Sequence, residues 1–216
     1  MKISILTLFP QMFEGVFSHS IIKRAQDKKL LELEFINIRD FGLGPHKVVD
    51  DTPYGGGVGM VIRVDVIEKA LLQARCDKIE KCNEWVILTD PRGETFSQKK
   101  ALKLSRINHL IFICGHYEAI DERVMEMTNE KLSVGNYILT GGEIPTMTMI
   151  DATVRLIKGV LSKEEATKLE SFSMDSYLEH PHFTKPRVWR NKKVPEELLS
   201  GNHKVIKEWK RKNSVS

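Results

Sequence analysis

The sequence predicts an α/β protein built on a mainly parallel sheet. Four apolar runs rich in Ile, Leu, Phe and Val have the length and composition of buried strands. They cover residues 3–8, 33–38, 84–89 and 109–114. Helical patterns lie between them, and one has apolar residues at the i, i+3/i+4 spacing, namely Val66, Ile67, Ala70, Leu71 and Ala74. Because strands alternate with helices, we expect ligand-binding loops where the strands end.

The bulk composition fits one large domain, or one domain with an appendage. The chain has 216 residues, of which 41% are hydrophobic, enough to form a core. Its first residues, MKISILTLFP, contain one lysine and a short apolar run that ends at Pro10, which predicts a first strand and no leader or membrane helix. The three cysteines, Cys76, Cys82 and Cys114, lack paired metal spacing and indicate reduced thiols in a cytoplasm.

Unusual residues follow the later predicted strands, in TDPRGE (89–94), CGHYEAIDER (114–123) and SVGNYILTGGEIP (133–145). In the last segment, Gly135 and the pair Gly141–Gly142 flank Ile138 and Leu139, which predicts a short extended run whose backbone can approach a ligand. A phosphate loop does not fit, because Gly-Glu-Ile-Pro stands where Gly-Lys-Ser/Thr is needed. The alternative is an ordinary strand-to-helix turn with Pro145 at the first helical position.

Positive charge is concentrated near the C-terminus. The formal net charge is +4, but residues 185–212 contain ten lysines or arginines against three glutamates, together with Trp189 and Trp209. Lysine and arginine neutralise phosphates and aromatic rings stack on unpaired bases, so this part suits a nucleic-acid contact. A solvated helix face is the alternative. Periodicity fades between about 159 and 190, which predicts a mobile connector, and helical patterns follow at 195–199 and 202–212.

Six collinear motifs carry a resemblance to a known family. They are VDDTPYGGGVGM (49–60), CGHYEAIDERV (114–124), GNYILTGGEIP (135–145), IDATVRLIKGVL (150–161), HPHFTKP (180–186) and LLSGNH (198–203). Together they resemble the bacterial tRNA (guanine-N(1))-methyltransferases of the knotted SPOUT class, the TrmD family. The resemblance runs from Met1 to about Lys212. It implies methyl transfer from S-adenosylmethionine to N(1) of the guanosine just 3′ of the anticodon of tRNA.

The resemblance also implies the fold and the cofactor site. Residues 1–160 would form a knotted α/β domain with a deep trefoil knot, 161–190 a mobile linker with a catalytic residue, and 191–216 a short basic helical tRNA-binding domain. S-adenosylmethionine would lie in the knot, where backbone groups of residues 134–139 read the adenine edge. The motif match gives the cofactor-binding residues as Leu88, Thr89, Pro91, Gly115, Ser133, Val134, Gly135, Asn136, Tyr137, Ile138, Leu139, Gly141, Gly142 and Pro145.

The chemistry of guanine requires a general base. N(1) carries a proton in the neutral base, so its lone pair can attack a methyl group in line only when that proton leaves, and an arginine can stabilise the charge that spreads to the carbonyl oxygen. The resemblance places the base at Glu170, the arginine at Arg155 and a supporting carboxylate at Glu118. The alternatives are a solvated Glu170, an Arg155 that snorkels from its helix and a Glu118 at a helix N-terminus.

Three positions depart from the family pattern. Glu170 stands where aspartate is usual, which predicts retained but altered activity; His116 replaces an arginine, and Asn136 stands where aspartate is common. His180 and His182 have no third residue spaced to complete a metal site. The family associates Mg²⁺ with activity, but no residues here can be assigned to hold it.

The resemblance further predicts the partners. The residues expected to contact tRNA are Asp50, Asp51, Tyr117, His116, Lys185, Arg187 and Lys207. A homodimer is expected in which each active site takes cofactor from one subunit and the catalytic linker from the other, so that a Glu170 mutant mixed with an Arg155-deficient subunit would partly recover activity. Two alternatives stay open: a tRNA-binding module that binds the cofactor without turnover, and a SPOUT methyltransferase for another RNA.

Overall fold

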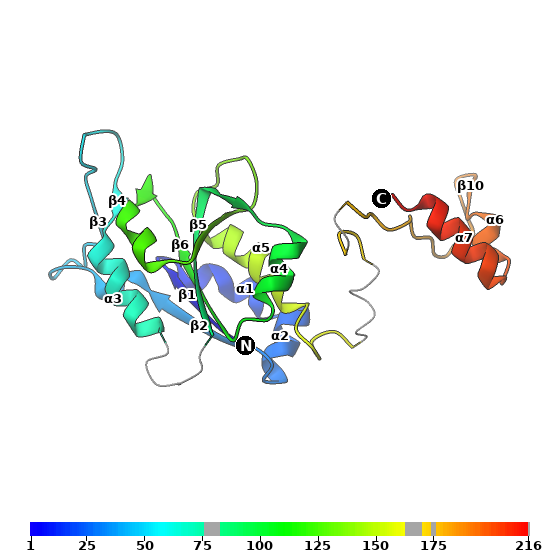
Figure 1. Ribbon diagram of the computed structural model, residues 1–216, viewed down its shortest axis with the longest axis horizontal. Helices are drawn as coiled ribbons and strands as arrows, with labels where there is room; N and C mark the ends of the chain where they lie inside the picture. The colour runs from blue at the N-terminus through cyan, green and yellow to red at the C-terminus, as the bar shows by residue number, and fades with distance from the viewer. Residues whose placement is uncertain (76–82, 163–169, 174–175, 216) are drawn as a thin grey trace. The chain divides into compact units, whose positions relative to one another are not determined.

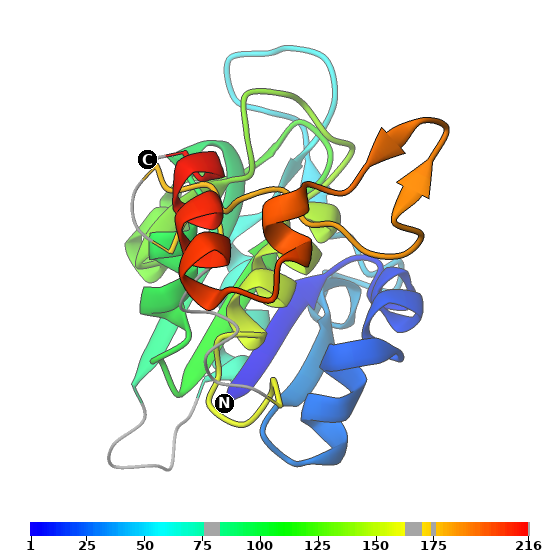
Figure 2. The same cartoon turned by 90° about the vertical axis from the view of Figure 1, so that its right-hand side faces the viewer.

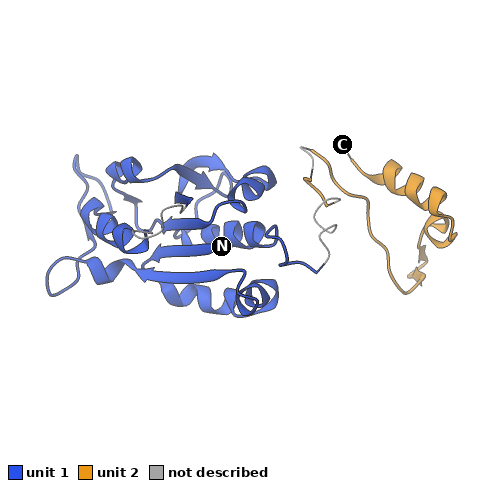
Figure 3. Cartoon of the chain, turned by 60° about the horizontal axis from the view of Figure 1, so that its bottom comes forward, with its two compact units in different colours: residues 1–162 blue, residues 163–216 orange. Residues whose placement is uncertain are grey.

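A computed structural model describes residues 1–75, 83–162, 170–173 and 176–215. Cys76, Cys82 and most of the first half of the predicted linker therefore lie outside the described residues. The chain forms two compact units, residues 1–162 and residues 163–216 (Figure 3). Each unit is described by itself.

The first unit is built on a five-stranded sheet with the order β2-β1-β6-β5-β8 (Figures 1 and 2). Every neighbouring pair is parallel. The strands are β1 (Lys2–Thr7), β2 (Glu32–Asn37), β5 (Glu84–Thr95), β6 (His109–Cys114) and β8 (Glu130–Ser133). The predicted α/β class and the mainly parallel sheet are confirmed, and the four apolar runs all form strands.

Helices pack on both faces of this sheet because its strands are apolar on both sides. One face, which includes Ile3, Ile5 and Phe112, is covered by α1 (Glu14–Phe17), α2 (Ser20–Asp27), α4 (Gln98–Leu104) and α5 (Glu143–Val154) (Figure 1). The other face, with Leu6 and Ile113, is covered by α3 (Val64–Ala74) and the 3-10 helices η2 (Ile38–Phe41) and η3 (Glu122–Met127). A further 3-10 helix, η1 (Pro10–Phe13), follows β1. The predicted apolar stripe of α3 is buried throughout.

The strand that contains TDPRGE ends later than expected. β5 runs to Thr95 and pairs with β8 up to Thr89 and again at Glu94 and Thr95, while residues 90–93 form an unpaired irregularity between the two stretches. The extended run expected at Ile138–Leu139 is absent from the described residues, since the strand is Glu130–Ser133 and the two apolar residues lie exposed in the loop after it. Pro145 is the third residue of α5, where a missing N–H is still tolerated.

A small three-stranded sheet lies beside the large one. It has the order β3-β4-β7, with β3 (Asp50–Asp51), β4 (Val61–Ile62) and β7 (Ala119–Ile120). This sheet joins the glycine-rich segment 52–60 to the residues that follow β6. It therefore brings two of the recognised motifs next to each other.

The second unit contains the hairpin β9 (Val188–Trp189) and β10 (Lys192–Lys193), then α6 (Glu196–Leu199) and α7 (His203–Asn213). Both predicted C-terminal helices form. The division of the chain at 160 and 190, the knot and the role of the helices as an RNA-binding domain stay predictions. No helix among the described residues is long and apolar enough to cross a membrane.

Candidate active site

A pocket of about 700 Å³ lies at the carboxyl ends of β5, β6 and β8. Its walls bring together twelve of the fourteen predicted cofactor-binding residues, all except Gly135 and Asn136. His116, Tyr117 and Glu118, predicted for substrate or catalysis, also line it. This is the edge of a parallel sheet where the strand connectivity of α/β proteins places ligand sites.

The loop after β8 is held by its own short hydrogen bonds. The Ser133 hydroxyl donates to Gly135 O (3.0 Å) and accepts from Gly135 N (3.2 Å), while Tyr137 N donates to Gly135 O (3.0 Å). The Ile138 side chain remains 81% exposed. The loop is thus curled rather than extended, and it presents apolar side chains beside backbone polar groups.

Gly142 joins this loop to the one after β6. Its N–H donates to Gly115 O at 2.7 Å. A Cβ added at Gly142 would lie 2.7 Å from Gly115 N and 2.9 Å from the Cα of Cys114, and it would collide with the Thr89 hydroxyl. The glycine is therefore required by close approach of backbone to backbone, where the loop after β8 meets the end of β6.

A buried polar cluster lies behind the pocket wall. Glu143 is 1% exposed and accepts a hydrogen bond from the Thr7 hydroxyl at 2.7 Å. His116 Nδ1 lies 4.0 Å from Glu143 Oε2 and is a buried nitrogen with no hydrogen-bond partner among the described residues. The Cys114 thiol contacts Thr146, and its burial raises its pKa, so it stays protonated.

Glu118 is positioned by the glycine-rich segment. Its N–H donates to Met60 O at 3.1 Å, and its side chain packs so closely on Gly59 that a Cβ there would lie 2.6 Å from Oε1. Tyr117 adopts a left-handed φ of +59°, a strained conformation for a residue with a side chain. Its hydroxyl accepts a hydrogen bond from Arg39 at 3.4 Å.

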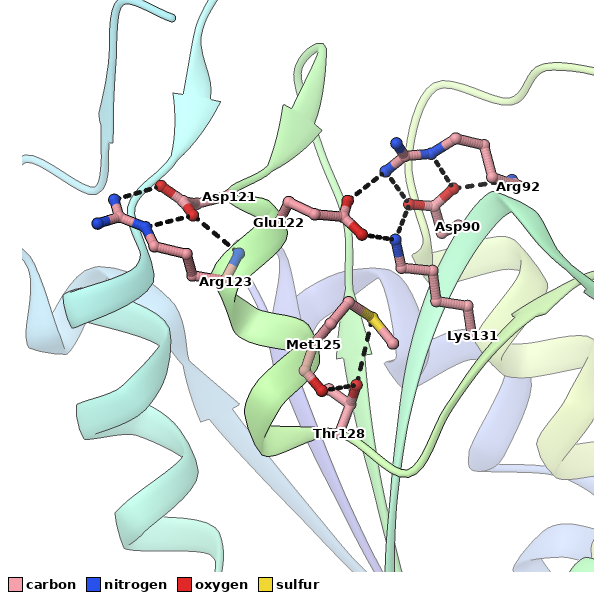
Figure 4. Close-up of polar contacts among 8 residues, drawn as sticks. All are labelled: Asp90, Arg92, Asp121, Glu122, Arg123, Met125, Thr128 and Lys131. Atoms are coloured by element: carbon pink, nitrogen blue, oxygen red, sulfur yellow. Dashed lines mark hydrogen bonds and ion pairs between the residues drawn. The ribbon is translucent and has the colours of Figure 1, made fainter. Parts of the chain in front are cut away.

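Four charged residues form a closed ring at the outer edge of the pocket, hereafter the ion ring (Figure 4). Arg92 Nη2 lies 2.9 Å from Asp90 Oδ2 and 3.0 Å from Glu122 Oε2, and Lys131 Nζ lies 2.7 Å from Glu122 Oε1 and 3.9 Å from Asp90 Oδ2. Burial disfavours the charged form of Asp90, but hydrogen bonds from Arg92 outweigh it and lower the Asp90 pKa. The Lys131 hydrogen bond lowers the Glu122 pKa. The ion ring links β5, η3 and β8.

Five predicted residues of the first unit are not part of the pocket lining, namely Gly135 and Asn136 of the loop after β8, and Arg155, Asp50 and Asp51. Arg155 follows the last residue of α5, whereas Gly142 and Pro145 at the other end of that helix line the pocket. Twelve helical residues at 1.5 Å each separate the two ends by about 18 Å. Asp51 is engaged by Arg63 at 3.1 Å, and Asp50 pairs with Ile62 in the small sheet.

The remaining predicted residues belong to the second unit. Glu170 is partly buried, and Lys185, Arg187 and Lys207 are exposed. The His180 and His182 rings are in contact, with centroids 4.7 Å apart and planes tilted by 57°, and His182 lies 3.3 Å from Glu179. Within the described ranges, no three His, Cys, Asp or Glu side chains are grouped to hold a metal ion.

Sequence reasoning missed several residues of the pocket. Asp90, Arg92, Ala119, Ile120, Leu132 and Thr140 also line it. Asp90 and Arg92 belong to TDPRGE, which stood out as unusual but was assigned to a loop. Glu122 and Lys131 had no signal in the sequence, since their role depends on a pairing across three elements.

The fold and site define a class: an α/β protein with a ligand pocket made by three loops at the carboxyl edge of a parallel sheet. The family described as tRNA (Guanine-1)-methyltransferase TrmD matches residues 1–216. A protein of Carboxydothermus hydrogenoformans named tRNA (guanine-N(1)-)-methyltransferase is 53% identical over 216 residues, all of this chain and 83% of the relative. Proteins of the same name from Desulforamulus reducens and Staphylococcus aureus are each 48% identical, with 84% and 86% of their lengths covered. The chain belongs to the tRNA (guanine-N(1)-)-methyltransferase family.

Proposed function

We propose that the protein transfers a methyl group from S-adenosylmethionine to N(1) of the guanosine just 3′ of the anticodon in tRNA. Family membership over the whole chain supports the reaction, and the relatives' shared name supports the substrate. The observation that carries the proposal is the pocket, in which the predicted cofactor-binding residues at 88–91 meet residues of the family motifs at 114–124 and 135–145. Its volume lies within the range of roughly 300–1,000 Å³ typical of small-molecule sites.

The described residues suit an adenosine-containing methyl donor. Leu88, Val134 and Leu139 offer apolar contacts for a planar base, while the curled loop after β8 offers backbone donors and acceptors for its polar edge. The His116 side chain also lines the pocket. When bound, S-adenosylmethionine supplies an electrophilic methyl group. A deep trefoil knot formed by the same loops is part of this proposal.

Glu170 is the proposed general base. Its carboxylate accepts the N(1) proton of guanine, and the deprotonated nitrogen becomes the nucleophile. Arg155 stabilises the negative charge that develops on the guanine carbonyl oxygen. Glu118, which lines the pocket, orients the guanine ring. Mg²⁺ dependence is proposed from the family alone, with no site assigned.

The location of Arg155 favours an active site shared by two subunits. Because the length of α5 separates Arg155 from the pocket of its own subunit, we propose that Arg155 acts together with Glu170 at the pocket of a second copy, in place of the expected site in which the two residues come from different subunits. A homodimer would then hold two equivalent sites, each with a cofactor pocket from one subunit and catalytic side chains from the other.

The test uses labelled S-adenosylmethionine and an unmodified tRNA transcript with guanosine both at the target and just before it. Wild-type protein is expected to label this transcript, and Glu170→Gln to lower kcat by about 100-fold or more with less than a twofold change in cofactor affinity. A transcript without the preceding guanosine is expected to be labelled poorly. Cofactor binding without transfer to any tRNA would favour an inactive RNA-binding module, and equal labelling of both transcripts would favour a methyltransferase for another RNA.

A further inference from the structure

The second unit carries a short hairpin rich in positive charge, residues 187–194, hereafter the basic hairpin. Its strands β9 and β10 pair Trp189 with Lys192 and Val188 with Lys193, and Val194 N closes it on Arg187 O at 3.0 Å. The two turn residues, Arg190 and Asn191, have φ of +45° and +63°. Left-handed residues at both central positions are typical of the tight turns that match strand twist, so the hairpin tip has a defined shape.

The basic hairpin exposes a large aromatic side chain. Trp189 is 56% exposed, and the Arg190 guanidinium lies 4.8 Å from the centre of its ring. The other predicted stacking residue, Trp209, has ring contacts with His180 and Phe183 at 6.0 Å each and is partly buried in α7. Trp209 therefore stabilises its own unit, whereas Trp189 has a ring surface available to a partner.

The charge of the basic hairpin is unbalanced. Residues 187–193 contain Arg187, Arg190, Lys192 and Lys193 and no carboxylate. All four side chains are exposed, and none forms an ion pair with a residue in the described ranges. Elsewhere exposed lysines do pair, as Lys212 does with Glu208 at 3.0 Å. The hairpin thus presents four donors for anions around one aromatic ring.

We propose that the basic hairpin binds an unpaired nucleotide of the RNA substrate. The base stacks on the indole of Trp189, and Arg190, Lys192 and Lys193 contact the phosphates on either side. Stacking requires a base that is not inside a duplex, so the ligand is a loop nucleotide of tRNA. The inference rests on the proposed function, because that function supplies a structured RNA with unpaired bases.

The first arm of the test removes the ring. Trp189→Ala is expected to weaken the affinity for unmodified tRNA about tenfold, within the range measured for single stacked bases, while Trp189→Phe keeps most of it. Because Trp189 is exposed, both variants should keep the wild-type melting temperature and cofactor affinity. Trp fluorescence quenching on tRNA binding is expected to be smaller in Trp189→Phe.

The second arm removes the charges. The double variant Lys192→Gln/Lys193→Gln is expected to lower the slope of log Kd against log salt by roughly 1.4 to 1.8. Lys99→Gln/Lys103→Gln removes the same charge from the exposed face of α4 and is the matched control, with no change in slope expected.

A Trp189→Ala affinity within twofold of wild type would overturn the proposal. So would weaker self-association with unchanged tRNA affinity, which would assign the basic hairpin to a protein contact. A wild-type protein that binds tRNA through Trp189 but transfers no methyl group would refute the proposed function alone.

Discussion

Gly142 is the residue at which the pocket tolerates least change. Gly142→Ala places a methyl group against the backbone of Cys114 and Gly115, so we expect a loss of about 1–3 kcal/mol in the free energy of unfolding and a cofactor affinity at least tenfold lower. Thermal unfolding and calorimetric titration with S-adenosylmethionine measure the two effects. Gly15→Ala is the control, because a Cβ at Gly15 meets nothing within 4 Å. Equal behaviour of both variants would contradict the role given to Gly142.

His109 makes stability depend on pH. It is 1% exposed, and burial lowers its pKa, with the positive charge of Lys2 acting in the same direction. The unfolded chain therefore binds a proton at higher pH than the folded protein does, and folding loses stability as pH falls below the ordinary histidine value of about 6.5. We expect the free energy of unfolding to decline between pH 7 and 5, and His109→Gln to remove most of that slope. Urea titrations at several pH values measure it.

The ion ring acts at the scale of elements, since it ties β5, η3 and β8 together at the edge of the pocket (Figure 4). Glu122→Gln keeps the shape of the side chain but removes the charge that bridges Arg92 and Lys131. We expect a cofactor affinity about two- to fivefold lower, in line with exposed ion pairs, and a smaller effect at high salt. Arg123→Gln breaks the neighbouring pair with Asp121, which joins the start of η3 to the residue just before it and does not link separate strands, and should leave cofactor affinity unchanged. A similar loss of cofactor affinity in both variants would contradict the role of the ion ring at the pocket.

The helices and strands that could be predicted from the sequence are those marked by a pattern of neighbouring apolar residues. The apolar runs gave four strands, and Val66 to Ala74 gave a buried helix face, because both patterns follow directly from strand and helix geometry. The strand Glu130–Ser133 was not predicted, because it contains only one apolar residue and its position depends on pairing with β5. The continuation of β5 through Asp90 to Thr95 was missed for the same reason, since a register shift is set by the partner strand.

The candidate site could be predicted only in part, because several of its contacts join residues that are far apart in the sequence. Residues in glycine-rich motifs could be assigned from resemblance, and twelve of the fourteen meet in one pocket. The burial of Glu143 was not predicted, because nothing local in the sequence indicates its contacts with Thr7 and His116. Glu118 was assigned as a supporting carboxylate from the resemblance, but its packing against Gly59 was not predicted, because Gly59 lies in another motif.

At the scale of the whole molecule, the separation of Arg155 from the pocket predicts how subunits cooperate. If Arg155 and Glu170 both act at the partner's pocket, mixed dimers of Gly142→Ala with either Arg155→Ala or Glu170→Gln contain one complete site and should recover up to half of the wild-type activity per dimer. Mixed dimers of Arg155→Ala with Glu170→Gln contain no complete site and should stay inactive. Differently tagged subunits, purified through both tags, provide these dimers, and recovery in the last combination would place Arg155 at its own pocket.

The central claim is methyl transfer to one atom of one nucleotide. The most direct measurement is to treat an unmodified tRNA transcript with the protein and labelled S-adenosylmethionine, digest it to nucleosides and identify the labelled product by mass spectrometry. We expect 1-methylguanosine as the single labelled nucleoside, mapped to the position just 3′ of the anticodon. Label on another base or another atom of guanine, or no label although cofactor and tRNA both bind, would contradict it.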